Sequence, residues 1–418
     1  MRILVVTNHF WPENFRINDL ALGLKERGHE ITVFTGVPDY PGGKFHAGYG
    51  IFKRRTEDYQ GVRVVRFPLI PRGKGKSLNL VFNYFSSVMF SCLVAPFYCR
   101  GKYDLIFIFD TSPVTIALPA ILLKKIKSAP LFMWILDLWP ESLSATGAVT
   151  APKVLDVVRG LVRFIYKNCD KLLISSRGFQ DSIEETGGYR GKPVYFPNWV
   201  EPEYLTESAD NLSQSLPELP SGFLVMFAGN IGAAQDFETI ISAAEKLREY
   251  EDIHWVILGD GRNADWVKDQ VEQKKLGSQF HLLGRFPAET MPLFFNQADA
   301  LLLTLKSEPI FALTVPGKLQ SYMASGTPVV AGIDGEGARL INEAGAGLSC
   351  SAQNPAELAE KILQLYRMTP DERKMMGGNG LKYCFEHFER NALFDKLEFL
   401  MLDEIDQKNN NERYNENS

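Results

Sequence analysis

Short apolar runs alternate with amphipathic stretches along the whole chain, and this alternation leaves few folds open. It is typical of βαβ units, in which parallel strands are joined by helices. In the first half we expect strands at Ile3–Val6, Ile31–Thr35, Val62–Phe67, Leu105–Phe109, Leu131–Leu136 and Lys171–Ile174. The rhythm restarts in the second half, where we expect strands at Leu224–Phe227, Trp255–Leu258, Phe280–Leu283, Ala300–Leu305 and Pro328–Ala331. The predicted fold class is α/β, with two Rossmann-like domains.

The domain boundary is predicted near Asn198–Gly222, because a stretch rich in Ser, Pro and acidic residues begins at Glu207. We expect an N-terminal domain over residues 1–203 and a C-terminal domain over 204–385. A helix over 386–406 could return to the first domain, and the polar tail 407–418 is predicted to be disordered. Ligands of parallel sheets bind outside the carboxyl ends of the strands, so two facing domains would share a ligand cleft.

Charge is divided unevenly along the chain. Residues 1–200 carry 26 Lys and Arg against 16 Asp and Glu, whereas residues 201–418 carry 19 against 34. A basic half is attracted to an anionic surface or a phosphate-bearing ligand. Nucleic acid is the weaker interpretation, because no nucleic-acid-binding motif is visible. The five cysteines lack metal-ligand spacing, and the N-terminus lacks the apolar core of a signal peptide, so we expect a cytoplasmic protein.

The longest apolar segment is Leu78–Tyr98, with Arg72, Lys74 and Lys76 before it and Arg100 and Lys102 after it. Its Asn and Ser residues and Pro96, which we expect to end the segment, argue against a membrane span. Two interpretations stay open. One is a buried helix of the domain, which the polar interruptions favour, and the other is a helix lying at a membrane surface with basic anchors.

Several chemistries lack their motifs. No GxGxxG fingerprint opens either half, which disfavours a dinucleotide cofactor. The six histidines show no zinc spacing, and the sequence has no Asp-x-Asp pair that would bridge a metal to a diphosphate. A GxSxG elbow for Ser-His-Asp hydrolysis is also missing. We therefore expect neither a metal nor a cofactor.

Two segments of the second half could bind a phosphate group. Gly229 and Asn230 follow its first strand, where a tight glycine turn could expose backbone amides; an ordinary βα turn would look the same. The second segment is Val315–Lys318, where Pro316 and Gly317 form a turn before a helix that Lys318 opens. Lys318, together with Arg285 after another strand, could supply the cations that a diphosphate needs in an acidic half; solvated surface charge is the alternative.

These segments resemble the family-four retaining glycosyltransferases of the GT-B fold. The motifs that carry the resemblance are FAGNIG (227–232), WVILGDG (255–261), HLLGRFP (281–287), PGKLQSYMASGTPVV (316–330) and, in the first half, NHFWPENF (8–15) and ILDLWPESL (135–143). The wording is similar to that of WbuB-type transferases of bacterial O-antigen and capsule assembly. The resemblance implies a UDP-activated amino sugar as donor and a lipid-linked saccharide as acceptor.

The sequence departs from the family pattern at its donor residues. Ser321 and Leu313 stand where the family has two glutamates, and Asn230 and Gln235 stand where it has an Arg and a Lys. We infer that Lys318 and Arg285 replace the missing cations. A displaced Glu308 would take over a sugar contact as a catalytic residue, and Ser321 would remain at the donor.

In the first half, Asp137 ends a strand-like run beside a turn, where a catalytic carboxylate would lie; capping of the next helix explains it equally well. Asn14, Arg16, Asp110 and Trp139 lie in corresponding loops and are predicted to bind the acceptor.

The sequence thus predicts a retaining, metal-independent hexosyltransferase that moves a sugar, N-acetylated by the resemblance, from a UDP-sugar to a lipid diphosphate-linked saccharide. It would act in surface polysaccharide synthesis, peripherally at the inner face of the cytoplasmic membrane. A nucleotide-sugar epimerase of the same fold and a non-catalytic scaffold of a polysaccharide assembly complex are the alternatives.

Overall fold

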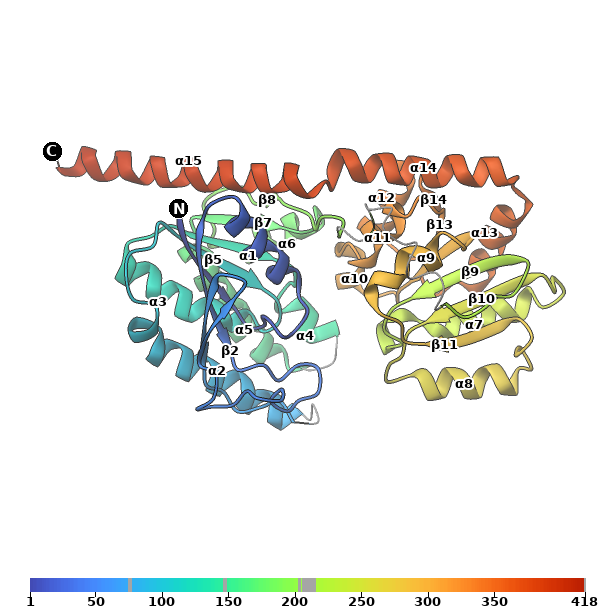
Figure 1. Ribbon diagram of the computed structural model, residues 1–418, viewed down its shortest axis with the longest axis horizontal. Coiled ribbons are helices and arrows are strands. Elements are labelled where there is room, and N and C mark those ends of the chain that lie inside the picture. Colours follow the sequence, from blue (N-terminus) through green and yellow to red (C-terminus); the bar gives the residue numbers. More distant parts are fainter. Residues whose placement is uncertain (74–76, 146–148, 202–203, 205–215, 417–418) are drawn as a thin grey trace. The chain divides into compact units, whose positions relative to one another are not determined.

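The computed structural model describes residues 1–73, 77–145, 149–201, 204 and 216–416. The chain divides into two compact units (Figure 1): Met1–Phe196 together with Phe394–Ser418, and Pro197–Leu393. The first break therefore lies at Phe196 rather than at the expected residue 203. Residues 205–215 of the predicted linker, like Lys74 and Lys76, lie outside the described residues.

The N-terminal unit is built on an eight-stranded sheet of order β3-β4-β2-β1-β5-β6-β7-β8. All neighbouring strands are parallel except β3 and β4, which form an antiparallel pair at one edge. The strands are β1 (Arg2–Thr7), β2 (Glu30–Gly36), β3 (Thr56–Tyr59), β4 (Val62–Phe67), β5 (Leu105–Asp110), β6 (Leu131–Ile135), β7 (Lys171–Ile174) and β8 (Val194–Tyr195). Central strands such as β5, with the sequence LIFIFD, are buried throughout, because helices cover both faces of a parallel sheet.

The C-terminal unit has a six-stranded parallel sheet of order β11-β10-β9-β12-β13-β14. Its strands are β9 (Phe223–Ala228), β10 (Ile253–Leu258), β11 (Phe280–Gly284), β12 (Ala300–Thr304), β13 (Val329–Gly332) and β14 (Gly347–Cys350). β9 adjoins β10 on one side and β12 on the other, so the chain changes direction across the sheet beside β9. Ligands of such sheets bind at this switch point.

Helices surround both sheets (Figure 1). In the first half they are α1 (Arg16–Glu26), α2 (Ser77–Tyr98), α3 (Ala117–Lys127), α4 (Glu141–Ala145), α5 (Pro152–Asn168) and α6 (Phe179–Thr186). In the second half they are α7 (Phe237–Lys246), α8 (Ala264–Gln273), α9 (Met291–Phe295), α10 (Pro309–Leu313), α11 (Lys318–Ala324), α12 (Glu336–Ala344), α13 (Pro355–Arg367), α14 (Pro370–His387) and α15 (Arg390–Glu416).

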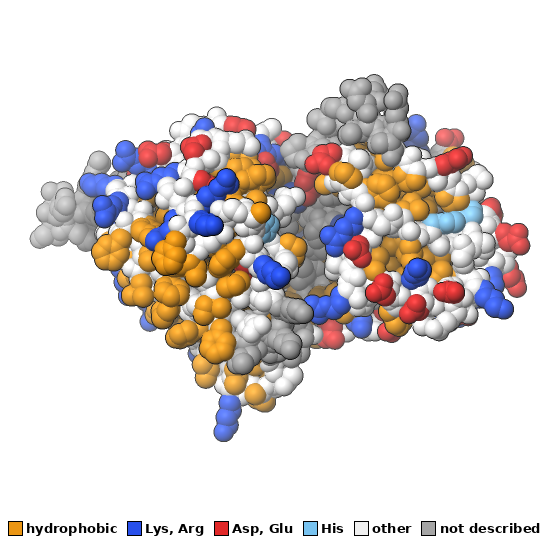
Figure 2. Space-filling model, turned by 60° about the horizontal axis from the view of Figure 1, so that its bottom comes forward, with side chains coloured by type: hydrophobic (Ala, Val, Ile, Leu, Met, Phe, Trp, Pro, Cys, Tyr) orange, Lys and Arg blue, Asp and Glu red, His pale blue; other side chains and the backbone are white. Residues whose placement is uncertain are grey.

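Helix α2 buries several polar residues and exposes a row of large apolar side chains. Asn83, Ser86, Ser87 and Ser91 are buried, whereas the exposed large apolar side chains are Val81, Phe82, Phe85, Met89, Leu93 and Phe97. Figure 2 shows orange side chains gathered on this part of the N-terminal unit. The buried-helix interpretation is therefore wrong for the outer face, and the helix continues through Pro96 to Tyr98. By length and composition alone Asn79–Tyr98 could cross a membrane, a test that many core helices also pass.

Helix α15 corrects the prediction of a disordered tail, because it continues through residues 407–416. Its side chains are paired with the N-terminal unit, to which residues from Phe394 onward belong. Lys171 Nζ lies 3.1 Å from Glu404 Oε2, and Lys408 donates a hydrogen bond to the Ser128 carbonyl. These tertiary contacts stabilise a helix that its polar composition does not predict.

Candidate functional site

A pocket of about 370 Å³ opens at the carboxyl ends of β9, β10 and β11 in the C-terminal unit. Its lining residues are Gly229, Asn230, Leu258, Gly259, Asp260, Arg285, Phe286, Ala288 and Met291. It thus lies beside the switch point of the sheet. The pocket brings together three residues that the sequence predicted for the donor, namely Gly229, Asn230 and Arg285.

Two glycines make this pocket possible. Gly229 has φ of 144° and Gly259 has φ of 141°, a backbone region that side chains disfavour. A Cβ on Gly259 would lie 1.8 Å from the Gly229 carbonyl oxygen, and a Cβ on Gly229 would lie 2.8 Å from Lys318 Nζ. The loops after β9 and β10 therefore approach each other and the Lys318 amine as closely as backbone allows.

Lys318 places its amine behind this glycine turn. Its Nζ is buried, has no hydrogen-bond partner among the described residues, and lies 3.9 Å from the centre of the Phe227 ring. Burial lowers the pKa of Lys318 to about 7. An unpartnered amine against a pocket wall is a group that an incoming anion would satisfy.

Arg285 differs from Lys318 because its side chain is 71% exposed. It contacts Asp260 across the pocket rim, with 3.5 Å between Nε and Oδ2. A pair this exposed contributes little to stability, so either side chain can turn toward a ligand at small cost.

Neither Lys318, which lies behind Gly229, nor the remaining residues predicted for the donor are among the residues that line the pocket. Val315 is buried, Gly317 is exposed, and the Pro316 ring closely approaches Gly337. Ser321 is buried on α11 and donates a hydrogen bond of 2.8 Å to Glu201 Oε2. Helix α11 has seven residues and no side-chain cap, so the phosphate-binding helix end that the sequence suggested is short. Glu308 directly precedes α10 and is not among the residues that line the pocket.

The N-terminal unit has a carboxylate cluster at the ends of β5 and β6, formed by Asp110, Asp137 and Glu141. Asp110 Oδ1 and Glu141 Oε2 are buried without hydrogen-bond partners in the part of the chain that the structure describes, as is the neighbouring Thr111 hydroxyl. Three such oxygens at one sheet edge are unusual for a folded protein and are the kind of groups that a polar ligand satisfies.

Burial controls the protonation of the two aspartates. It raises the pKa of Asp110 well above its ordinary value, and the charge of Asp137 adds to the shift. Burial also raises the pKa of Asp137, although the nearby Ser142 and Trp139 side chains and the Leu138 amide oppose the effect. Asp110 from the loop after β5 therefore lies close to Asp137, which shares the loop after β6 with Trp139.

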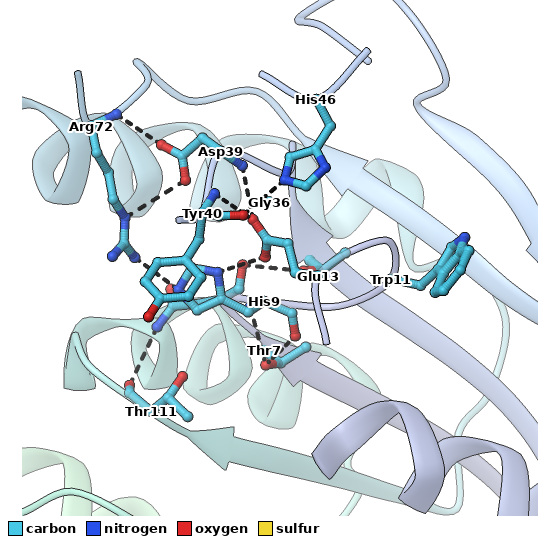
Figure 3. Close-up of polar contacts among 12 residues, drawn as sticks. Thr7, His9, Trp11, Glu13, Gly36, Asp39, Tyr40, His46, Arg72 and Thr111 are labelled. Atoms are coloured by element: carbon cyan, nitrogen blue, oxygen red, sulfur yellow. Dashed lines mark hydrogen bonds and ion pairs between the residues drawn. The ribbon is translucent and has the colours of Figure 1, made fainter. Parts of the chain in front are cut away.

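A second cluster in the same unit joins the loops after β1 and β2 to the segment before α2 (Figure 3). Glu13 Oε2 lies 2.7 Å from His9 Nδ1, while Glu13 Oε1 accepts hydrogen bonds from the Asp39 and Tyr40 amides. Arg72 donates to His9 Nε2 at 2.8 Å, which places the histidine proton on Nδ1. The Arg72 amide also donates to Asp39 Oδ2.

Sequence reasoning missed His9, Glu13 and Asp39, and took Arg72 only as a basic flank. The available signal was an acidic residue four positions after a histidine that follows the first strand. Asn14 is exposed in that loop and Arg16 begins α1, so both lie close to this cluster in the chain. The described residues contain no group of three His, Cys, Asp or Glu side chains placed to hold a metal ion.

Comparison with known proteins follows the division into halves. Residues 14–199 match the family described as "Glycosyl transferase 4-like domain", and residues 208–383 match "Glycosyl transferases group 1". A curated relative from Pseudomonas aeruginosa, by name the glycosyltransferase WbjE, is 29% identical over 58% of this chain and 63% of its own length, less than two thirds. WcaI of Escherichia coli (strain K12), by name a colanic acid biosynthesis glycosyl transferase, is 26% identical over 78% of this chain and 82% of its own length.

Solved structures match nearly the whole chain. Sucrose-phosphate synthase from Thermosynechococcus elongatus superimposes with a TM-score of 0.72 at 17% identity, covering 96% of this chain and 99% of that one. Anabaena HepE, solved in complex with UDP, gives a TM-score of 0.67 at 15% identity, covering 96% of this chain and 100% of that one. The predicted GT-B fold is confirmed.

Proposed function

Because both halves of this chain belong to glycosyltransferase families, the 4-like domain at residues 14–199 and group 1 at residues 208–383, we propose that it transfers a sugar from a UDP-sugar to a lipid diphosphate-linked saccharide. The setting would be bacterial surface polysaccharide synthesis. We also propose that the configuration of the sugar is retained and that the sugar is N-acetylated; both proposals rest only on the resemblance of the sequence to the family.

The Lys318 amine is the observation that carries the donor assignment. It lies buried and unpartnered against Gly229, at the wall of the pocket beside the switch point. A diphosphate in this pocket would receive a charge-assisted hydrogen bond from Lys318 and a second contact from Arg285 at the rim. A solved neighbour of the same fold holds UDP, which supports uridine diphosphate as the ligand.

The acceptor is assigned to the N-terminal unit because its carboxylate cluster has oxygens to satisfy. Sugar hydroxyls would donate to Asp110, Glu141 and Thr111, whose buried oxygens otherwise lose hydrogen bonds. Asp137, the carboxylate that the sequence predicted to be catalytic, would orient the attacking hydroxyl. That hydroxyl forms the new glycosidic C–O bond while the bond from the anomeric carbon to the diphosphate breaks, and its proton passes to the diphosphate oxygen of the departing UDP.

No metal is needed in this scheme, because two cationic side chains meet the charge that develops on the diphosphate. Lys318 acts in a water-poor setting, where a fixed positive charge stabilises a leaving group more than in water. Arg285 acts from the exposed rim and contributes less. Glu308 is proposed to contact the sugar and Ser321 the donor, from the segments on either side of Lys318.

A lipid anchor on the acceptor requires that the enzyme approach a membrane, and α2 offers the surface. Phe82, Phe85 and Leu93 are each more than half exposed, whereas the polar side of the helix is buried. Each large apolar side chain that leaves water is favoured by about 1.5–3 kcal/mol. Exposed Arg100 and Lys102 follow the helix and would attract anionic lipid, so a peripheral position at the cytoplasmic membrane is proposed.

Thermal shift with uridine nucleotides tests the donor assignment. UDP at 100 times its dissociation constant should stabilise the fold by about 2.7 kcal/mol, and a panel of UDP-sugars should show which sugar adds to this effect. Lys318→Ala should weaken UDP binding by about 1.5–3 kcal/mol, the range for hydrogen bonds to charged groups. Equal stabilisation of wild type and Lys318→Ala would remove Lys318 from the site.

A further inference from the structure

The surroundings of Lys318 favour a neutral amine when the pocket is empty of anions. An ammonium at this position makes none of the hydrogen bonds that it makes in water, since Nζ is buried and has no partner among the described residues. The Phe227 ring, 3.9 Å away, offers an ammonium the attraction of an aromatic face. Removal of the ammonium from water costs more than this attraction returns, and desolvation is the one cause of the lowered pKa of Lys318.

The acidic side chains nearby do not stabilise the Lys318 ammonium, because each is paired with another residue. Asp260 reaches the same pocket from the loop after β10, but it faces Arg285 from the loop after β11, at 3.5 Å. Glu201, from the segment after β8, accepts a hydrogen bond from Ser321 on α11. Helix α11 carries no charged residue besides Lys318. Desolvation is accordingly the cause that lowers the pKa of Lys318 to about 7.

An anionic ligand in the pocket would raise the pKa of Lys318 again, because the amine lies directly against the pocket wall. A Cβ on Gly229 would lie 2.8 Å from Nζ, so no side chain separates the amine from the backbone that lines the pocket. A diphosphate brings at least two negative charges to that wall. Opposite charges this close favour the ammonium over the neutral amine and so raise the pKa of Lys318.

We propose that Lys318 is neutral in the free protein and takes up a proton when a nucleoside diphosphate enters the pocket beside Gly229. This inference rests on the proposed donor site and adds its charge chemistry. The site would exclude a permanent buried charge while empty, and would create the cation only where the leaving diphosphate needs it. Arg285 cannot act in this way, because a guanidinium stays charged at any working pH.

Proton uptake has a definite pH dependence. At pH 8 a group that titrates near 7 is about 0.9 neutral, so binding should take up close to one proton. Below pH 7 the pH dependence that Lys318 contributes should disappear, and a further change near pH 6 would reflect protonation of the terminal phosphate of UDP. Binding should weaken about fivefold between pH 7 and pH 8, because each UDP bound must then draw a proton from solution.

Calorimetry of UDP binding at pH 8 measures this proton directly. The terminal phosphate of UDP, with a pKa of about 6, is fully ionised there and gives up no proton. The titration is run in HEPES and in Tris, two buffers that differ in their enthalpy of ionisation and contain no phosphate to compete for the pocket. The observed enthalpies should differ by that difference multiplied by about 0.9 proton for each UDP bound.

Two variants assign the proton. Lys318→Met keeps an unbranched apolar stem against Phe227 and should bind UDP more weakly, with the same enthalpy in both buffers. Arg285→Met, the matched control at the rim, should also weaken binding but keep the uptake of wild type. Equal enthalpies of wild type in the two buffers would overturn the proposal, and so would uptake that persists in Lys318→Met. If a variant fails to fold, the comparison of the two buffers on wild type can still overturn the proposal. Failure of UDP to bind wild type at any pH would instead overturn the donor site itself.

Discussion

Among single residues, Asp137 most directly separates a catalytic role from a structural one. Burial raises the pKa of its carboxyl group, while the nearby Ser142 and Trp139 side chains and the Leu138 amide oppose that shift. Asp137→Asn keeps the shape of the side chain and removes its charge. If Asp137 orients the acceptor hydroxyl, turnover should fall by about 10²–10⁴-fold, while UDP affinity and the melting temperature change little. Parallel loss of stability and activity would instead support the role of a helix cap.

Asp110 gives a prediction about stability and pH. Burial raises its pKa well above the ordinary value, so the folded state holds the proton more tightly than the unfolded state. The stability that this proton provides is complete below the unfolded pKa of about 3.9 and is lost as pH rises toward the folded pKa. Asp110→Asn should therefore gain stability relative to wild type between pH 5 and pH 8, in urea unfolding. A difference that stays constant across this range would contradict the assignment.

A candidate site residue could be predicted from the sequence where its neighbours in the chain form a recognisable motif. Lys318 was found because it follows a Pro-Gly turn, and Asp137 because it ends an apolar run. The unpartnered state of the Lys318 amine could not be predicted, because it depends on Phe227 and Gly229, far away in the chain. The hydrogen bond between Ser321 and Glu201 could not be predicted from the sequence either, since 120 positions separate the two residues.

At the scale of secondary-structure elements, Glu13 joins the loops after β1 and β2 and, through His9 and Arg72, the segment before α2. Glu13→Ala leaves two backbone amides and the His9 ring without a buried acceptor. We expect a loss of about 1–3 kcal/mol in the free energy of unfolding for each group left unsatisfied. Glu13→Gln retains one acceptor oxygen and should lose less. Unchanged urea midpoints for both variants would show that the cluster is dispensable.

Helix α2 is predicted to hold the protein to anionic vesicles. Replacing the exposed Phe82, Phe85 and Leu93 together by Ser should abolish co-sedimentation with such vesicles and leave the melting temperature nearly unchanged. The control places three Ser residues at Val154, Val157 and Phe164 on α5, which are also exposed. Wild type should dissociate as salt rises, because exposed charges are screened within about 10 Å at 0.1 M. If wild type ignores anionic vesicles at low salt, the membrane assignment fails.

Substitution of the basic residues before α2, which the sequence offered as membrane anchors, would be a poorer test of membrane binding. Arg72 is part of the buried cluster with His9 and Asp39, so its loss should unfold the loops as well as remove charge. Lys74 and Lys76 lie outside the described residues. Which side of α2 faces the domain could not be predicted from the sequence either, because Asn83, Ser86, Ser87 and Ser91 looked like interruptions of an apolar segment and are in fact buried.

Apolar rhythm predicted the strands of both sheets within a residue or two, since a strand covered on both faces must be apolar throughout. Three short strands escaped it, namely β3, β8 and β14. The first is a polar edge strand with the sequence TEDY, the second has two residues, and the third reads GLSC. Pairing to a neighbour, rather than apolar content, defines these strands.

For the whole molecule, the uneven charge fits a division of labour between the two units. The basic half carries α2 and the carboxylate cluster proposed for the acceptor, and the acidic half carries the pocket with Lys318. A nucleotide-sugar epimerase would need the second half but no acceptor, and an assembly scaffold would need neither chemistry. The fold is common to all three, so only the reaction decides between them.

Transfer of a labelled sugar is the measurement that tests the central claim most directly. Purified protein is incubated with UDP-sugars labelled in the sugar, with and without a lipid-linked saccharide extract, and label is counted in the organic phase. We expect label in that phase, and free UDP in equal amount, only when both substrates are present. Asp137→Asn should reduce both together. A changed sugar without acceptor, or no reaction with any donor despite bound UDP, would contradict the account.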